Sequence, residues 1–302
     1  MAPFPQALTA SARGGIHVES IFAWGFGGLL TGLREGVEAA LIVGIIASYL
    51  VKIGRADRLA SVWFGVAAAI ASSIGIGVLA FVLLGSLQGT AEQIFAGTAS
   101  LLAVVILTYM LFWMRKQAVT LGAELRGGVD RAVASASMLG LSLLAFTAVI
   151  REGIETALFL LGQTTAASGE GLSVVLGAFV GLLIAAGIGV LIFRAGLRLN
   201  LSAFFNVTGA ALVVIASGLL SYGVHEFIEV GLLPALIDPV YDISAILPHK
   251  EGIGQFLRAI VGYSSTPELT TLLAQGAYLI FGLLFYVRPV RRAAATRAAA
   301  GA

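Results

Sequence analysis

Long apolar stretches separated by short polar segments make up most of this 302-residue chain. Each of seven stretches is long enough to cross a bilayer once, because a membrane-spanning helix needs about 20 mostly apolar residues. These stretches cover residues 24–51, 59–84, 93–114, 133–163, 171–193, 204–229 and 270–287. The pattern therefore predicts an all-α, polytopic membrane protein with seven transmembrane helices.

Two of the seven stretches carry the same charged motif in the middle of an otherwise apolar run. Residues 34–38 read Arg-Glu-Gly-Val-Glu, and residues 151–155 read Arg-Glu-Gly-Ile-Glu. A charged side chain at the bilayer centre costs at least about 2.5 kcal/mol, so neither motif is expected to face lipid. A costly motif that occurs twice at matching depth indicates a functional site.

Helical geometry predicts what each motif presents. At 100° per residue, the arginine and both glutamates of a motif fall on one helix face. The charged residues are Arg34, Glu35 and Glu38 in the first stretch, and Arg151, Glu152 and Glu155 in the fourth. Gly27, Thr31 and Thr147 continue these faces with small or hydroxylated side chains, which favour close helix packing. We expect the two charged faces to meet inside the bundle.

Composition agrees with a membrane protein and narrows the chemistry. The chain is 59% hydrophobic and 11% charged, with a mean hydropathy of +0.99. It has no cysteine, so a metal would need oxygen or imidazole ligands. No phosphate-binding Gly-x-x-x-x-Gly-Lys loop and no nucleophile and base at useful spacing are found. We therefore predict a protein that is not an enzyme, with no permanently bound cofactor and no nucleic-acid partner. Trp24, Phe112 and Trp113 are typical of a membrane-interface belt.

The basic residues predict the orientation in the membrane. They gather in alternate connections, at Lys52, Arg55, Arg58, Arg115, Lys116, Arg126, Arg131, Arg194, Arg198, Arg288, Arg291, Arg292 and Arg297. The connections 85–92 and 162–171 contain no lysine or arginine. The positive-inside rule then places the amino terminus outside and the carboxyl terminus in the cytoplasm, in a plasma (inner) membrane. Residues 1–20 lack the pattern of a removable signal peptide and are expected to form an exposed tail.

The chain also shows an internal repeat within one transmembrane domain, 1–302. Repeat one covers about 22–116 and repeat two about 131–230, and each begins with a motif helix. An odd number of helices per copy makes the second copy enter the membrane from the opposite side, giving an inverted 3+3 repeat with the substrate site near the midplane. An outer loop at about 231–269, a seventh helix at about 270–288 without a counterpart and a cytoplasmic tail at 289–302 follow.

Acidic residues gather on the predicted outer side. His225, Glu226 and Glu229 stand at the end of the sixth helix, and Glu92 stands at the start of the third. Such a surface would raise the local concentration of a cation before it enters, so we interpret these residues as a possible recruitment site. Two structural alternatives remain. The first three residues could form an ordinary hydrated helix end, and Glu92 could favour the amino-terminal dipole of its helix.

Four buried glutamates suit a hard cation, because carboxylate oxygens can replace its hydration shell. With two arginines beside them, the group carries a formal charge of −2, which a multivalent cation or protons would balance. Oxygen ligands favour ferric iron, ferrous iron or manganese over copper(I) or zinc. An inside-negative potential would drive import, at about 2.3 kcal/mol per charge per 100 mV. The alternatives are a proton-coupled transporter of another small solute, and ion pairs that only lock two helices together.

The two motifs, in the first and fourth of seven spans, resemble the high-affinity iron permease family, the oxidase-dependent ferric iron transporters of fungi and bacteria. Three further stretches are similar to bacterial members. They are Thr108-Tyr109-Met110 through Trp113-Met114, His225-Glu226 before Gly231, and Gly262-Tyr263 before Pro267.

The resemblance implies a permease that imports iron, with ferric iron expected first and lead as another metal handled within the family. Glu35, Glu38, Glu152 and Glu155 would be the iron-handling carboxylates, with Arg34 and Arg151 as their partners. An extracytoplasmic iron oxidase, peroxidase or iron-binding protein is the expected partner. Rocking of one repeat against the other would release the ion inward.

Overall fold

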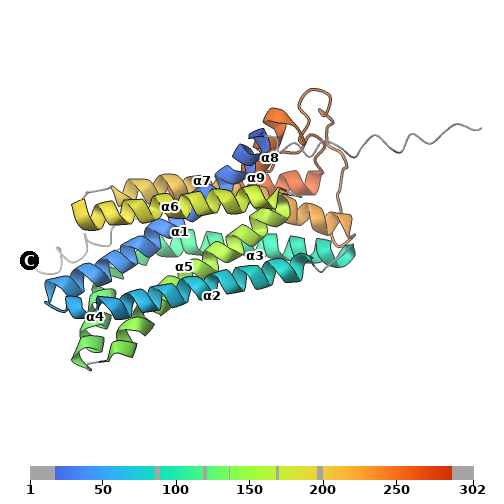
Figure 1. The fold of residues 1–302 in the computed structure, drawn as a ribbon. Helices are drawn as coiled ribbons and strands as arrows, with labels where there is room; N and C mark the ends of the chain where they lie inside the picture. Colours follow the sequence, from blue (N-terminus) through green and yellow to red (C-terminus); the bar gives the residue numbers. More distant parts are fainter. Residues whose placement is uncertain are drawn as a thin grey trace, which may run out of the picture.

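Every regular element in the described part of the chain is a helix (Figure 1). The computed structural model describes residues 18–85, 89–117, 121–135, 137–167, 170–195 and 200–287. The α-helices are α1 (Val18–Lys52), α2 (Leu59–Gly85), α3 (Thr90–Gln117), α4 (Leu121–Ala134), α5 (Met138–Ala166), α6 (Gly171–Ala195), α7 (Leu201–Glu229), α8 (Gly252–Val261) and α9 (Leu269–Val287). A turn of 3-10 helix, Ala56–Arg58, precedes α2. The all-α prediction is confirmed.

The described helices include five that are long and apolar enough to cross a membrane, namely α2, α3, α6, α7 and α9. Helices α1 and α5 are also long, with 35 and 29 residues, but each carries the three charges of a motif. Large apolar side chains such as Phe64, Phe179 and Phe281 are exposed along α2, α6 and α9, as expected for helices that face lipid. The chain is accordingly a multi-pass membrane protein.

The helices pack in pairs that are distant in sequence. Helix α1 packs most extensively on α6, α2 packs on α5, and α3 packs on α7, which also contacts α9. Two apolar clusters fill the bundle. One contains Leu107, Phe159 and Leu212 from α3, α5 and α7, and the other contains Ile46 and Val62 from α1 and α2. The bundle ends at α4 on one side and at α8 on the other (Figure 1).

Helices α1 and α6 approach each other closely because glycine lines both sides of their contact. A Cβ atom added at Gly28 or Gly32 would overlap the backbone of α6 at Val174 or Ala178. In the same way, a Cβ at Gly177 of α6 would overlap the backbone of α1. Small residues favour this arrangement in membranes, where van der Waals contact between backbones drives helix association.

The predicted fourth stretch, 133–163, is wrong at its start, because the chain forms two helices there. Helix α4 ends at Ala134 and α5 begins at Met138. Ser137 accounts for the new start, since its hydroxyl accepts a hydrogen bond from the Gly140 amide at 2.9 Å and so caps α5. Helix α4 is short and amphipathic, with Leu125 and Val129 buried. The sequence analysis missed it, because apolar span length was the signal used.

The predicted outer loop, 231–269, contains the short helix α8. Helix α8 ends at Gly262, whose positive φ of 68° favours glycine, and Gly262 contacts the backbone of Gly218 in α7. Helix α9 is held from two sides. The Gln275 side chain donates to the Val261 carbonyl, and the Tyr278 hydroxyl lies 2.6 Å from that of Thr108 in α3. The predicted tail 289–302 and residues 1–17 of the predicted amino-terminal tail lie outside the described residues.

Candidate metal-binding site

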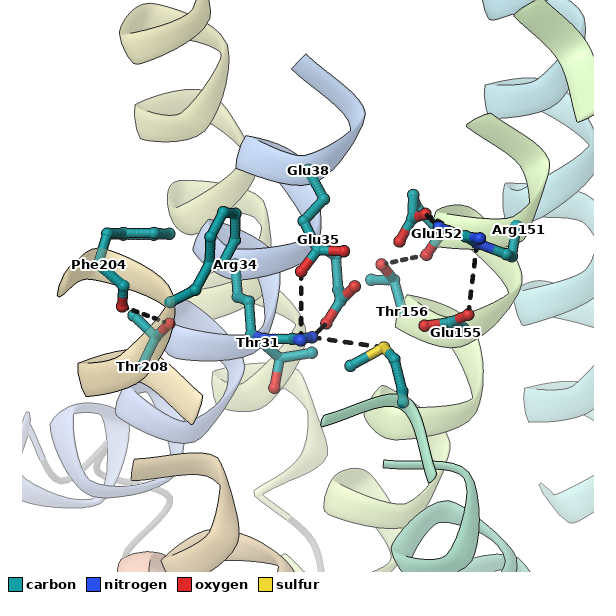
Figure 2. Close-up of polar contacts among 12 residues, drawn as sticks. Thr31, Arg34, Glu35, Glu38, Arg151, Glu152, Glu155, Thr156, Phe204 and Thr208 are labelled. Carbon is teal, nitrogen blue, oxygen red and sulfur yellow. Dashed lines mark hydrogen bonds and ion pairs between the residues drawn. The ribbon is translucent and has the colours of Figure 1, made fainter. Parts of the chain in front are cut away.

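The two charged motifs meet where α1 packs against α5 (Figure 2). Glu35 of α1 and Glu152 and Glu155 of α5 each offer a carboxylate oxygen, and these three atoms lie within 4.8 Å of one another. Glu35 and Glu152 are buried, and Glu155 is 16% exposed. The expected meeting of the two charged faces inside the bundle is therefore observed. Three carboxylates at this spacing could hold one metal ion.

The first motif is sealed inside the bundle. Arg34 is 2% exposed, and its Nη1 donates to Glu35 Oε1 at 2.5 Å. Its Nη2 lies 3.2 Å from Glu38 Oε1, four residues further along the helix. Glu38 is buried as well. Arg34 thus lies between both glutamates of its own motif, as the one-face geometry predicts.

The second motif repeats this pairing in a more open place. Arg151 Nη2 lies 2.5 Å from Glu152 Oε1, whereas its Nε is 3.8 Å from Glu155 Oε1. The Arg151 side chain is 38% exposed, and its guanidinium carbon lies 4.9 Å from the centre of the Trp113 ring in α3. That cation–π contact gives the arginine a further partner besides the glutamates. Arg151 therefore has one short and one long ion pair within its motif, whereas both ion pairs of Arg34 are short.

Each of the four glutamates has a buried Oε2 atom that no described group hydrogen-bonds, at Glu35, Glu38, Glu152 and Glu155. Glu38 Oε1 is also buried without a hydrogen bond, although it lies 3.2 Å from Arg34 Nη2. A buried carboxylate oxygen without a partner costs free energy, so such atoms are normally paired in proteins. Four of them gathered around one place form an oxygen-rich donor set, which suits a hard cation rather than a soft one.

The glycine inside each motif is a contact point for a further helix. A Cβ at Gly36 would overlap the Ala185 side chain of α6, and a Cβ at Gly153 would overlap the Ser73 side chain of α2. Both positions thus admit a neighbouring helix close to the charged residues, one from each side. The motif spacing alone does not reveal this role.

Several neighbours of the site were missed by the sequence analysis. Arg34 Nη1 donates to Met110 Sδ in α3 at 3.4 Å, and Gln163 Nε2 of α5 donates to Thr31 Oγ1 at 2.8 Å. The expectation for Thr31 agrees with its full burial. The expectation for Thr147 is wrong, because this residue is exposed and bonds only to carbonyls of its own helix.

The expected aromatic belt is wrong for Trp24, and Trp113 has a contact that the sequence analysis did not predict. Trp24 is buried in the apolar cluster around α3 and α7 rather than at an interface. Trp113 lies over the Arg151 guanidinium. Two aromatic side chains assigned to the lipid boundary thus support the interior and the charged site.

The candidate recruitment residues lie at the end of the bundle that carries α8. His225 joins two carboxylates, with Nε2 3.4 Å from Glu229 Oε1 and Nδ1 2.6 Å from Glu268 Oε1. Glu226 is buried, and Glu92 is exposed in the first turn of α3. His225 and Glu229, four residues apart on α7, therefore face each other. Glu268, which the sequence analysis did not single out, completes the arrangement.

Glu268 gives a pH-dependent test of this end of the bundle. Burial raises the pKa of its carboxyl, but the hydrogen bond from Thr271 and the nearby His225 outweigh burial, so the pKa lies below its ordinary value. A carboxyl whose folded pKa is depressed stabilises the fold above its unfolded pKa, and this contribution is lost as the pH falls through the folded pKa.

We therefore expect Glu268→Gln to lower the melting temperature in detergent at pH 7 by about 2 to 4 °C, the effect of roughly 1 kcal/mol. The deficit should shrink as the pH is lowered below 4.5. Glu251→Gln, an exposed change in the same loop, serves as the control. A deficit of equal size at every pH would contradict the expectation.

The chain is similar to known proteins over most of its length. Residues 25–293 match the sequence model of the Iron permease FTR1 family. An uncharacterized protein of Archaeoglobus fulgidus is 39% identical over 279 residues, which are 88% of this chain and 98% of that protein. A protein of Escherichia coli named ferrous iron permease EfeU is 36% identical over 264 residues, 87% of this chain and 95% of that protein. A Yersinia pestis protein of the same name is 35% identical over 269 residues, with 88% and 95% covered. No solved structure matches the chain.

Proposed function

The chain belongs to the iron permease FTR1 family, and we propose that it imports iron through its two Arg-Glu-Gly-x-Glu motifs. The observation that carries this proposal is the set of buried glutamate oxygens, at least one from each motif glutamate, that no described group hydrogen-bonds. Glu35, Glu152 and Glu155 would bind the ion directly, since their oxygens already lie within 4.8 Å of one another. Glu38, one turn from Glu35, would join them or take the ion next.

The arginines would keep the site folded and ionised when no ion is bound. Each arginine donates to the glutamate that follows it and leaves the other oxygen of that carboxylate available. An incoming cation would compete with the guanidinium groups for the carboxylates. The arginines thus balance half of the carboxylate charge when the site is empty, and the cation would balance the rest, which lowers the cost of keeping charges inside the membrane.

The oxidation state of the iron separates two candidates. The resemblance to oxidase-dependent ferric iron transporters favours ferric iron, and that preference stays a prediction. Two observations favour ferrous iron. The formal charge of −2 on four glutamates and two arginines is balanced by a divalent ion, and the softer Met110 thioether lies beside Arg34. The Escherichia coli and Yersinia pestis relatives are also named ferrous iron permeases.

The packing supports seven spans arranged as an inverted repeat of α1–α3 and α5–α7. If the two halves are related by a two-fold axis, the contact between α1 and α6 corresponds to that between α5 and α2. Both are extensive, and α3 against α7 and α1 against α5 are pairs of equivalent helices. The motif glycines follow the same rule, because Gly36 meets α6 and Gly153 meets α2.

The α8 end would face outward, in line with the orientation predicted from the charges. The opposite end carries basic residues, as the positive-inside rule requires of a cytoplasmic side. They are Lys52 at the end of α1, Arg55 and Arg58 after it, and Arg126 and Arg131 in α4. An extracytoplasmic iron oxidase, peroxidase or iron-binding protein remains the proposed partner. The outward end presents the carboxylates of Glu92 and Glu229 to such a partner or to the ion itself.

Uptake into proteoliposomes of purified protein tests the proposal. We expect entry of iron under an inside-negative potential, with ferrous iron kept reduced, ferric iron held by a weak chelator, and manganese and lead offered separately. The preferred ion identifies the oxidation state. A folded protein that moves none of these ions, but moves protons in a pH gradient without metal, would instead favour the proton-coupled alternative.

A further inference from the structure

A cavity of about 160 Å³ lies at the α8 end, between α1, α5, α7, α8 and α9. Its wall includes Trp24, Gly27, Gln163, His225, His249 and Glu268. The His225 side chain is 42% exposed, so the cavity communicates with the surface at this end. The volume is enough for several water molecules, and hence for an ion that keeps part of its hydration shell.

Gln163 lies on the inner side of this cavity, and its side-chain amide is hydrogen-bonded to described groups at the nitrogen but not at the oxygen. Its side chain is 4% exposed, and Nε2 donates to Thr31 Oγ1 at 2.8 Å. Its carbonyl oxygen, Oε1, is buried and accepts no hydrogen bond from any described group. A Cβ at Gly27 would lie 3.2 Å from Oε1, so glycine at that position leaves room beside the oxygen. A neutral oxygen acceptor is thus held at the cavity without a donor.

Gln163 and Thr31 stand between the cavity and the glutamates on both helices. On α1, Gly27, Thr31 and Glu35 are four residues apart and therefore lie on one face, each about 6 Å further along the axis. On α5, Gln163 lies two turns beyond Glu155. Figure 2 shows Thr31 beside Arg34 and near Glu35. An ion that leaves the cavity for Glu35 would meet this pair first.

We propose that Gln163 and Thr31 form an entrance subsite, in which Gln163 Oε1 and the second lone pair of Thr31 Oγ1 accept a partly dehydrated metal cation and pass it to Glu35. This inference rests on the proposed function. Neutral oxygens fit the task, because a site on a conduction path must bind well enough to admit the ion and weakly enough to release it. A carboxylate at the same place would hold the ion.

The test compares four variants with the wild-type protein in proteoliposomes. Gln163→Leu removes the acceptor, Gln163→Glu adds a charge, and Thr31→Val removes the hydroxyl at similar volume. Gln255→Leu in α8, outside the cavity wall, is the matched control. Iron uptake gives the maximal rate and the KM, while calorimetric titration of detergent-solubilised protein with ferrous iron, without oxygen, gives equilibrium binding.

We expect Gln163→Leu and Thr31→Val to slow uptake by about 10-fold, the loss typical of one partner in a metal site, with equilibrium binding and melting temperature close to wild type. Gln163→Glu should lower both the KM and the maximal rate. The control should behave as wild type. A purely structural role predicts a different result. Iron binding and uptake would both be lost in the Gln163→Leu and Thr31→Val proteins, and their melting temperatures would fall.

Two results would overturn the subsite and leave the proposed function intact. One is normal uptake by the Gln163→Leu protein. The other is the combined loss of iron binding, uptake and thermal stability in the Gln163→Leu and Thr31→Val proteins. In both cases the wild type is active and the Glu155→Gln protein is inactive. The proposed function fails, and the subsite with it, if the wild type neither binds nor transports iron. The same conclusion follows if the Glu155→Gln protein takes up iron as fast as the wild type.

Discussion

Iron uptake by a Glu155→Gln protein is expected to fall by at least about 100-fold, while the folded protein still accumulates in the membrane. A ligand carboxylate should matter at least as much as the outer-shell partners of metal sites, which are typically worth about 10- to 100-fold. Glu155 is the cleanest of the four glutamates to change. Its ion pair with Arg151 is long, at 3.8 Å, and Arg151 keeps Glu152 and Trp113 as partners.

Glu35→Gln should abolish uptake too, but its interpretation needs more care. Arg34 is almost fully buried and lies 2.5 Å from Glu35, and removing one partner of a buried ion pair commonly costs about 3 to 5 kcal/mol. Uptake by each variant is therefore normalised to folded protein measured by size-exclusion chromatography. Glu124→Gln, an exposed change in α4, should transport normally. If the Glu155→Gln protein took up iron at the wild-type rate, the glutamate cluster would have no part in transport.

Replacing Gly28 by leucine is expected to prevent accumulation of folded protein. A side chain at this position would overlap the carbonyl of Val174, which belongs to the backbone of α6 and cannot rotate away. Overpacking costs about 1 to 3 kcal/mol in ordinary cores and more where the obstacle is rigid. Helices α1 and α6 would have to separate along their contact, and the first motif would lose its support at Gly36.

Gly44→Leu provides the matched control in the same helix. A Cβ at Gly44 meets nothing within 4 Å, so the leucine side chain has space. Leucine also has a higher helix propensity than glycine, by up to about 1 kcal/mol. Fluorescence-detected size-exclusion chromatography and thermal unfolding should show a folded Gly44→Leu protein and little or no folded Gly28→Leu protein. Equal behaviour of the two variants would contradict the close contact of α1 with α6.

The sequence analysis predicted the features that follow from local periodicity. Span length indicates α2, α3, α6, α7 and α9, the five described helices that are long and apolar enough to cross a membrane. A rotation of 100° per residue places Arg34, Glu35 and Glu38 on one face, where two ion pairs are found. The meeting of the two motifs was predictable as well, because a charged helix face inside a membrane turns away from lipid and toward the bundle interior.

The features it missed depend on contacts between helices or on short segments. Gln163, Met110 and Trp113 reach the site from apolar stretches in which nothing local distinguishes them. Helix α8 has only 10 residues, too few to register as a span. The break before α5 depends on one hydroxyl, that of Ser137, whose capping role is easily hidden in a long apolar run.

The interlocked glycines of α1 and α6 bear on how the protein could move. Backbones that touch at Gly28, Gly32 and Gly177 cannot slide past one another without losing that contact. Helices α2 and α5 are joined similarly, with Gly65 against the backbone of Ser142 and Gly153 against Ser73. The mechanical units are therefore two crossed pairs, each made of one helix from either half of the chain. A motion that keeps these contacts would carry α6 along with α1, so we infer a hinge between the two pairs. Rocking of one repeat against the other, as expected from the sequence, would instead have to break these contacts.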